Sequence, residues 1–241
     1  MILAGVDLAW QSERNPSAIA SGRLVDNTLT VTGIDAAVYG IDDVLDNLTA
    51  IKDLQGVAID APLIINNASG QRICETGIGK TYGSRHASCH TSNTKLYPDA
   101  KSVYLSQQLL DMGFEHLKGE RWQIECYPHP AIIEMFGLAE RLKYKKGRVQ
   151  EKREGQKVLA NFLLRLNESD ELALNCQGEF MKILDASYID SIGGQALKSN
   201  EDALDAVVCL YIAGLFSKNS NGEVFGDSDS GYIWIPQSNC L

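Results

Sequence analysis

The feature that most constrains this chain is a short apolar run that ends in an acid, and it occurs three times. The first run, residues 1–10, carries Asp7; the second ends at Asp60 and the third at Glu125. Runs this short, interrupted by a charge, predict buried strands and are too brief for a signal peptide or a membrane span. An ionised carboxylate in such a strand is costly unless a cation pairs with it.

The three runs predict an α/β fold whose strands bring their acids to one edge of a sheet. Apolar residues at helical spacing in residues 42–52 predict a crossover helix before the Asp60 strand, so that this strand is parallel to the first. The carboxyl ends of parallel strands lie at one edge, where sites form. A later helix, expected over residues 201–216, carries Asp202 and Asp205 three positions apart and hence on one face.

The remaining segments fit around this sheet. Residues 17–22 and 28–33 are expected to be short strands that continue from the first strand as an antiparallel meander. Residues 65–98 lack periodicity and are expected to be a functional loop, and residues 231–236 a short edge strand. We therefore expect one domain, 1–241, with insertions at about 65–120 and 138–198, a size that suits a single core.

Charge and cysteine content exclude several classes of protein. The formal net charge of −9 argues against a general nucleic-acid coat protein. Residues 141–157 nevertheless hold eight Lys or Arg against two Glu, and we expect a basic helix that either holds a polyanion over the acids or is simply a solvated face. The six cysteines form no Cys-x-x-Cys pair, which favours reduced thiols and a cytoplasmic protein.

The acids themselves predict a metal site. Clustered carboxylates repel one another unless a hard cation such as Mg²⁺ or Mn²⁺ lies among them. Two such ions, about 3.5 to 4 Å apart, can activate water for phosphodiester hydrolysis. The structural alternatives are that Asp7 and Asp60 cap turns, that Glu125 pairs with a basic residue, and that Asp202 only compensates its helix dipole.

Six short motifs in order carry a resemblance that runs nearly end to end. The chain resembles a domain-of-unknown-function family of predicted RNase H-like nucleases. The motifs are Gly5-Val6-Asp7-Leu8-Ala9-Trp10, Ile59-Asp60-Ala61-Pro62-Leu63, Arg72 with Cys74-Glu75, Glu125-Cys126-Tyr127-Pro128, Asp202-Ala203-Leu204-Asp205-Ala206 and Ile233-Trp234-Ile235-Pro236.

This resemblance implies an RNase H-like, five-strand mixed sheet in the order 3-2-1-4-5, flanked by helices. It implies that Asp7, Asp60 and Asp205 are metal-binding acids, with Asp202 one turn earlier as in resolvase-type members. The expected activity is metal-dependent hydrolysis of a nucleic acid or phosphate ester with one or two Mg²⁺ or Mn²⁺ ions.

The other expected site residues have less specific roles. Glu125 joins Asp7, Asp60 and Asp205 as a candidate catalytic acid. Four further residues are expected to line the cleft or contact substrate: Arg72, Glu75, Lys80 and Arg85.

Rival interpretations use the same residues differently. An actin-like or sugar-kinase phosphotransferase also places an acid on the first strand, but Asp7 is followed by Leu8-Ala9-Trp10 and not by Gly and Thr. A non-catalytic binding module would use the acids structurally. Residues 77–81 are similar to the tail of a P-loop but lack its first glycine. Four residues could be imagined as zinc ligands at a spacing unlike that of a known finger: Cys74, His86, Cys89 and His90.

Overall fold

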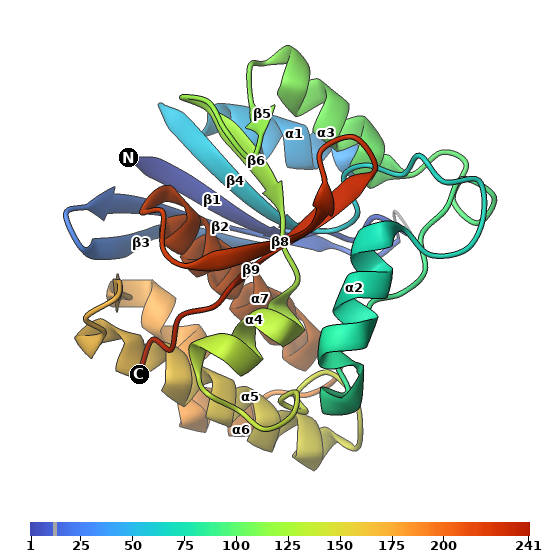
Figure 1. Cartoon of the computed structure of the whole chain (residues 1–241). Coiled ribbons are helices and arrows are strands. Elements are labelled where there is room, and N and C mark those ends of the chain that lie inside the picture. Colours follow the sequence, from blue (N-terminus) through green and yellow to red (C-terminus); the bar gives the residue numbers. More distant parts are fainter. Residues whose placement is uncertain (12–13) are drawn as a thin grey trace.

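A seven-stranded sheet runs through the molecule, and helices cover both of its faces (Figure 1). The computed structural model describes residues 1–11 and 14–241, and the statements below concern those residues. The strand order is β5-β6-β4-β1-β2-β3-β7. The strands are β1 (Ile2–Asp7), β2 (Ser17–Val25), β3 (Thr28–Val38), β4 (Leu54–Asp60), β5 (Glu115–His116), β6 (Trp122–Glu125) and β7 (Ala173–Asn175).

The sheet is mixed, as expected for an α/β protein, but its order differs from the five-strand order expected from the sequence. β2 runs antiparallel to β1 and β3, whereas β4 is parallel to β1 and β6 is parallel to β4. The extra strands are β5 at one edge and β7 at the other. They are two and three residues long, too short for a two-residue alternation to distinguish them from loops.

Helices occupy much of the chain between the strands. They are α1 (Ile41–Ala50), α2 (Ile73–Tyr82), α3 (Lys101–Asp111), α4 (Pro128–Met135), α5 (Val149–Arg165), α6 (Ala186–Ser191) and α7 (Gly194–Ser217), with 3-10 turns at Gly83–Arg85, Leu166–Glu168 and Gly178–Leu184. None of the helices in the described ranges combines the length and apolarity needed to cross a bilayer.

Three sequence expectations are corrected here. Residues 65–98 contain α2 and are not one loop; the whole P-loop-like segment, residues 77–81, lies inside this helix. The basic run 141–157 is helical only from Val149 onward, because Arg148 is the N-cap of α5. Finally, β9 (Gly231–Pro236) is not an edge strand of the main sheet: it pairs with β8 (Gly222–Asp227) in a separate two-stranded sheet.

The two faces of the main sheet have separate hydrophobic cores. Ala4 and Val6 of β1 and Ile59 of β4 pack with residues of α1 and α3. Leu3 and Ala58, one position out of phase, pack with α7, α4 and α5. Side chains along a strand alternate between faces, so the phase of each strand decides which side its last residue faces.

Candidate active site

The pleat of β1 and β4 turns Asp7 and Asp60 toward α7. Asp7 has the same phase as Leu3, and Asp60 the same phase as Ala58, which both belong to the core on the α7 side. The two aspartates are register partners in the parallel β1–β4 pair, where neighbouring strands lie about 4.8 Å apart. Both acids are therefore presented side by side at the end of the sheet.

A glycine in β1 allows α7 to lie directly against the sheet. A Cβ added at Gly5 would collide with the backbone of Ala206 and Leu210 in α7. The helix can approach this closely only where β1 has no side chain. Asp205 immediately precedes Ala206 and is fully buried, so the close approach carries its carboxylate to the side of the sheet that Asp7 and Asp60 face.

Mutual repulsion among these carboxylates follows from their proximity. The pKa of Asp60 is raised to about 7, first by burial, and further by the charges of Asp205 and Glu125. The pKa of Asp7 is raised well above its ordinary value, again mainly by burial, with added repulsion from Asp205, Asp60 and Asp202. Hence the structure brings together the four aspartates that the sequence grouped from β1, β4 and α7.

A lysine from the loop before α5 lies among these acids. Lys145 Nζ is 2.5 Å from Asp205 Oδ2, and the lysine side chain is only 25% exposed. Burial lowers the pKa of Lys145, but the charge of Asp205, together with Tyr144, Asp7 and Asp60, outweighs it and raises the pKa well above its ordinary value. The ammonium is thus a resident counter-charge for the cluster.

The loop that delivers Lys145 is held by its neighbours. Buried Tyr144 donates a hydrogen bond of 2.6 Å to Asp205 Oδ1. The backbone of Lys143 and Tyr144 rests on α5 at Gly155, where a Cβ would collide with it. His129 stacks edge-on against the Tyr144 ring at 5.5 Å, and burial lowers its pKa to about 3, so this histidine is neutral.

A second lysine pairs with two acids of α7, which lie beyond the first turn of this helix. Lys198 Nζ lies 2.5 Å from Asp202 Oδ1 and 2.8 Å from Glu201 Oε1. Both acids are only 3% exposed. Asp202 therefore pairs with the Lys198 ammonium, while the negative charge of Asp202 still raises the pKa of Asp7.

Glu125 belongs to a different buried network. In the β4–β6 register it is the partner of Ile59, so it leaves the sheet on the face opposite to Asp60. Arg72 Nη2 lies 2.6 Å from Glu125 Oε1, and Arg72 Nε lies 2.8 Å from Glu75 Oε1. The backbone amide of Leu63 also donates to Glu125. These ion pairs join the start of α2 to β6 beside Asp60, so Glu125 is not a fifth acid of the aspartate cluster.

The remaining cations expected to contact substrate lie toward the far end of α2. Lys80 is exposed in the last turn of this helix, about 12 Å along its axis from Arg72. Arg85 lies in the following 3-10 turn and forms an ion pair of 2.6 Å with Glu134. Neither is brought to Asp7 and Asp60, and their contact with substrate stays a prediction.

One comparison with known proteins identifies a family. The family described as "Protein of unknown function (DUF429)" matches residues 5–229. The chain belongs to this family. No curated protein and no solved structure matches it. The matched region of this DUF429 member contains the four aspartates and both lysines that pair with them.

The donor chemistry of the DUF429 site suits a hard cation, although its present arrangement does not form a ready metal site. Carboxylate oxygens are the ligands that Mg²⁺ and Mn²⁺ prefer, and buried Asp205 Oδ2 is one such oxygen, which faces the Lys145 ammonium in this structure. Among the described residues, however, no group of three or more His, Cys, Asp or Glu side chains is arranged to hold a metal ion. Lys145 supplies the positive charge instead.

Sequence reasoning missed Tyr144, Lys145 and Lys198 as parts of the DUF429 site. In the sequence, Lys145 is one of eight basic residues in the run 141–157, and nothing distinguishes it from the other seven. Gly147, at φ 121°, is a signal that this run leaves the helical conformation before Arg148. Lys198 stands four residues before Asp202, a spacing at which opposite charges meet on a helix.

Proposed function

We propose that the protein is a metal-dependent phosphodiesterase of the RNase H-like type, acting on a nucleic acid or nucleotide with Mg²⁺ or Mn²⁺. The observation that carries the proposal is the convergence of Asp7, Asp60 and Asp205 from β1, β4 and α7. Such a concentration of negative charge, with raised pKa values on Asp7 and Asp60, is a feature of functional sites. A divalent cation bound there would polarise the phosphodiester and activate water.

The residues of the chain have distinct roles in this proposal. Asp7, Asp60 and Asp205 would hold the cation through carboxylate oxygens, with Asp202 one turn away on α7. Tyr144 orients Asp205 through its hydrogen bond. Lys145 balances the charge of the acids in this structure, and a bound cation would take over that charge balance at Asp205. The Arg72 network keeps Glu125 and Glu75 engaged and fixes the segment that follows Asp60.

Hydrolysis assays test the proposal directly. We expect cleavage of bis(p-nitrophenyl) phosphate, or of labelled single-stranded DNA or RNA, in the presence of Mg²⁺ or Mn²⁺ and none in EDTA. Asp7→Asn and Asp60→Asn should each lower the rate at least about a hundredfold, because removing even the outer partners of metal ligands costs 10- to 100-fold. Asp46→Asn, an exposed acid on α1, is the matched control. Full activity in either site variant would refute the assignment.

The Lys145–Asp205 ion pair favours a second candidate, a binding module without catalysis. In that case the lysine is a permanent counter-charge. Calorimetry distinguishes the two, since a binding module would bind neither Mg²⁺ nor Mn²⁺, even after Lys145→Met. ATP in the same titration tests the phosphotransferase alternative.

A further inference from the structure

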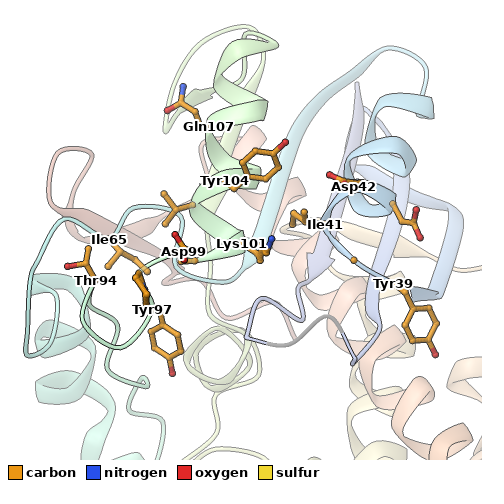
Figure 2. Close-up of a pocket in the computed structure, with 15 residues that line it drawn as sticks. Tyr39, Ile41, Asp42, Ile65, Thr94, Tyr97, Asp99, Lys101, Tyr104 and Gln107 are labelled. Atoms are coloured by element: carbon orange, nitrogen blue, oxygen red, sulfur yellow. The ribbon is translucent and has the colours of Figure 1, made fainter.

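A cavity of about 830 Å³ lies between the start of α1 and the start of α3 (Figure 2). It is lined by residues 39–43, by Ile65, by residues around Tyr97 and by the first turns of α3 as far as Gln107. Figure 2 shows Tyr97 at the lower left, Tyr39 at the lower right, and Tyr104 above Asp99 and Lys101. The proposed hydrolysis assigns no role to any of these residues.

Aromatic side chains are the first indication of what this cavity binds. Tyr39 is 50% exposed and Tyr104 is 46% exposed. Tyr97 packs edge-on against Trp10, with ring centroids 4.5 Å apart. Three tyrosines from separate segments around one cavity offer flat apolar faces with polar edges, which suit an aromatic heterocycle.

The charges of the cavity indicate which part of a ligand it takes. Among the described residues, three carboxylates line it, from Asp42, Asp43 and Asp99, against one ammonium, that of Lys101. This excess of negative charge disfavours a phosphate. Carboxylates accept hydrogen bonds from ring N–H and exocyclic amino groups, as they do when they read the edge of a base. A neutral heterocycle with amino groups therefore fits, whereas a sugar phosphate does not.

Two aromatic residues link the cavity to smaller pockets that contain the aspartates. Tyr39 also lines a smaller cavity of about 260 Å³ that contains Asp7 and Asp202. Trp10, which packs on Tyr97, lines a pocket of about 90 Å³ that contains Asp60. Tyr39 and the Trp10–Tyr97 pair therefore connect the cavity to the pockets that contain the acids to which the proposed function assigns phosphodiester hydrolysis.

We propose that this cavity binds the base of a nucleotide unit whose phosphate lies toward Asp7 and Asp60. The inference rests on the proposed function for the position of the phosphate, but binding of the base can be measured without hydrolysis. It makes the substrate a nucleotide or an unpaired strand, because a paired base inside a duplex has no exposed face for the tyrosines.

Binding of nucleosides to the full chain in EDTA tests this inference. Calorimetry should detect adenosine, guanosine or cytidine, with ribose 5-phosphate not binding. Tyr104→Ala should weaken nucleoside binding about 5- to 100-fold, the effect of losing one base–aromatic stack. Tyr104→Phe should retain binding. Leu96→Ala is the matched control, since Leu96 is 56% exposed in the loop that precedes α3 but does not line the cavity.

The outcomes separate this inference from the proposed function. Absence of nucleoside binding, equal binding by wild type and Tyr104→Ala, or preference for ribose 5-phosphate would each overturn the base site, even if phosphodiesters are cleaved. Nucleoside binding that depends on Tyr104, without any metal-dependent cleavage, would support the base site and reject the hydrolase. Unchanged thermal unfolding of Tyr104→Ala would verify that the loss is local.

Discussion

Replacing Lys145 by methionine tests whether its ammonium occupies the position of a cation. The change leaves buried Asp205 with only the hydrogen bond from Tyr144. Removing one partner of a buried ion pair costs about 3 to 5 kcal/mol. Because the Lys145 side chain is 25% exposed, we expect the lower end, about 3 kcal/mol. For a chain of this size that loss lowers Tm by about 6 to 12 °C.

The assay is thermal unfolding in EDTA and then with Mg²⁺ or Mn²⁺. A cation at a concentration of 100 Kd adds about 2.7 kcal/mol, so saturation should restore most of the stability lost in Lys145→Met. Wild type should gain less, since the cation must first displace the ammonium. Lys143→Met is the matched control, because Lys143 is on the same loop and its side chain is 69% exposed.

Two results would refute this reasoning. An unchanged Tm for Lys145→Met in EDTA would show that the ion pair contributes nothing in solution. Equal stabilisation of wild type and variant by Mn²⁺ would show that the lysine and the cation do not share a position.

Three further predictions concern the acids and the packing beneath them. The raised pKa of Asp60 means that the folded state holds a proton that the unfolded chain has lost, so in EDTA stability should fall by up to about 4 kcal/mol as pH rises from about 4 to about 7. Asp60→Asn should reduce this pH dependence of the unfolding free energy, measured by denaturant titrations at several pH values. An unchanged pH dependence would contradict the assignment of the effect to Asp60. Gly5→Ala should destabilise by at least about 1 to 3 kcal/mol through overpacking against α7. Gly79→Ala, where a Cβ meets nothing within 4 Å, should be neutral or stabilising, and equal effects would refute the close approach. Arg72→Met should cost about 3 to 5 kcal/mol in chemical unfolding, because it leaves two buried carboxylates unpaired; a loss below 1 kcal/mol would contradict this.

The sequence could predict the aspartate cluster because its geometry follows from local patterns. Apolar runs ending at Asp7 and Asp60 predict strands, and the crossover helix makes those strands parallel, which puts both acids at one edge. The spacing of Asp202 and Asp205 predicts their common helix, α7. Each of these steps uses residues within one or two elements.

Glu125 shows what a list of acids at strand ends leaves out. Strand phase decides the face, and counting back from Glu125 gives Ile124 in the core on the α7 side. Glu125 must then face the other way, toward Arg72. The sequence shows that Glu125 and Ile124 face opposite sides of the sheet. It does not show which of these sides α7 covers, and that decides whether Glu125 joins the aspartates.

The contribution of Lys145 could not be predicted for a different reason. No pattern in the sequence near Tyr144 indicates which helix the loop that carries Tyr144 and Lys145 packs against. Its support comes from Gly155, ten residues later, where the missing side chain lets two backbones touch. Such tertiary contacts involve no periodicity and no motif.

Through the contact at Gly155, the position of α5 determines where the loop that carries Tyr144 and Lys145 lies beside Asp205. A small displacement of this helix would move the Tyr144 hydroxyl and the Lys145 ammonium away from Asp205 together, since the two residues are adjacent in the loop that packs on Gly155. Proton donor and positive charge would leave Asp205 in one movement.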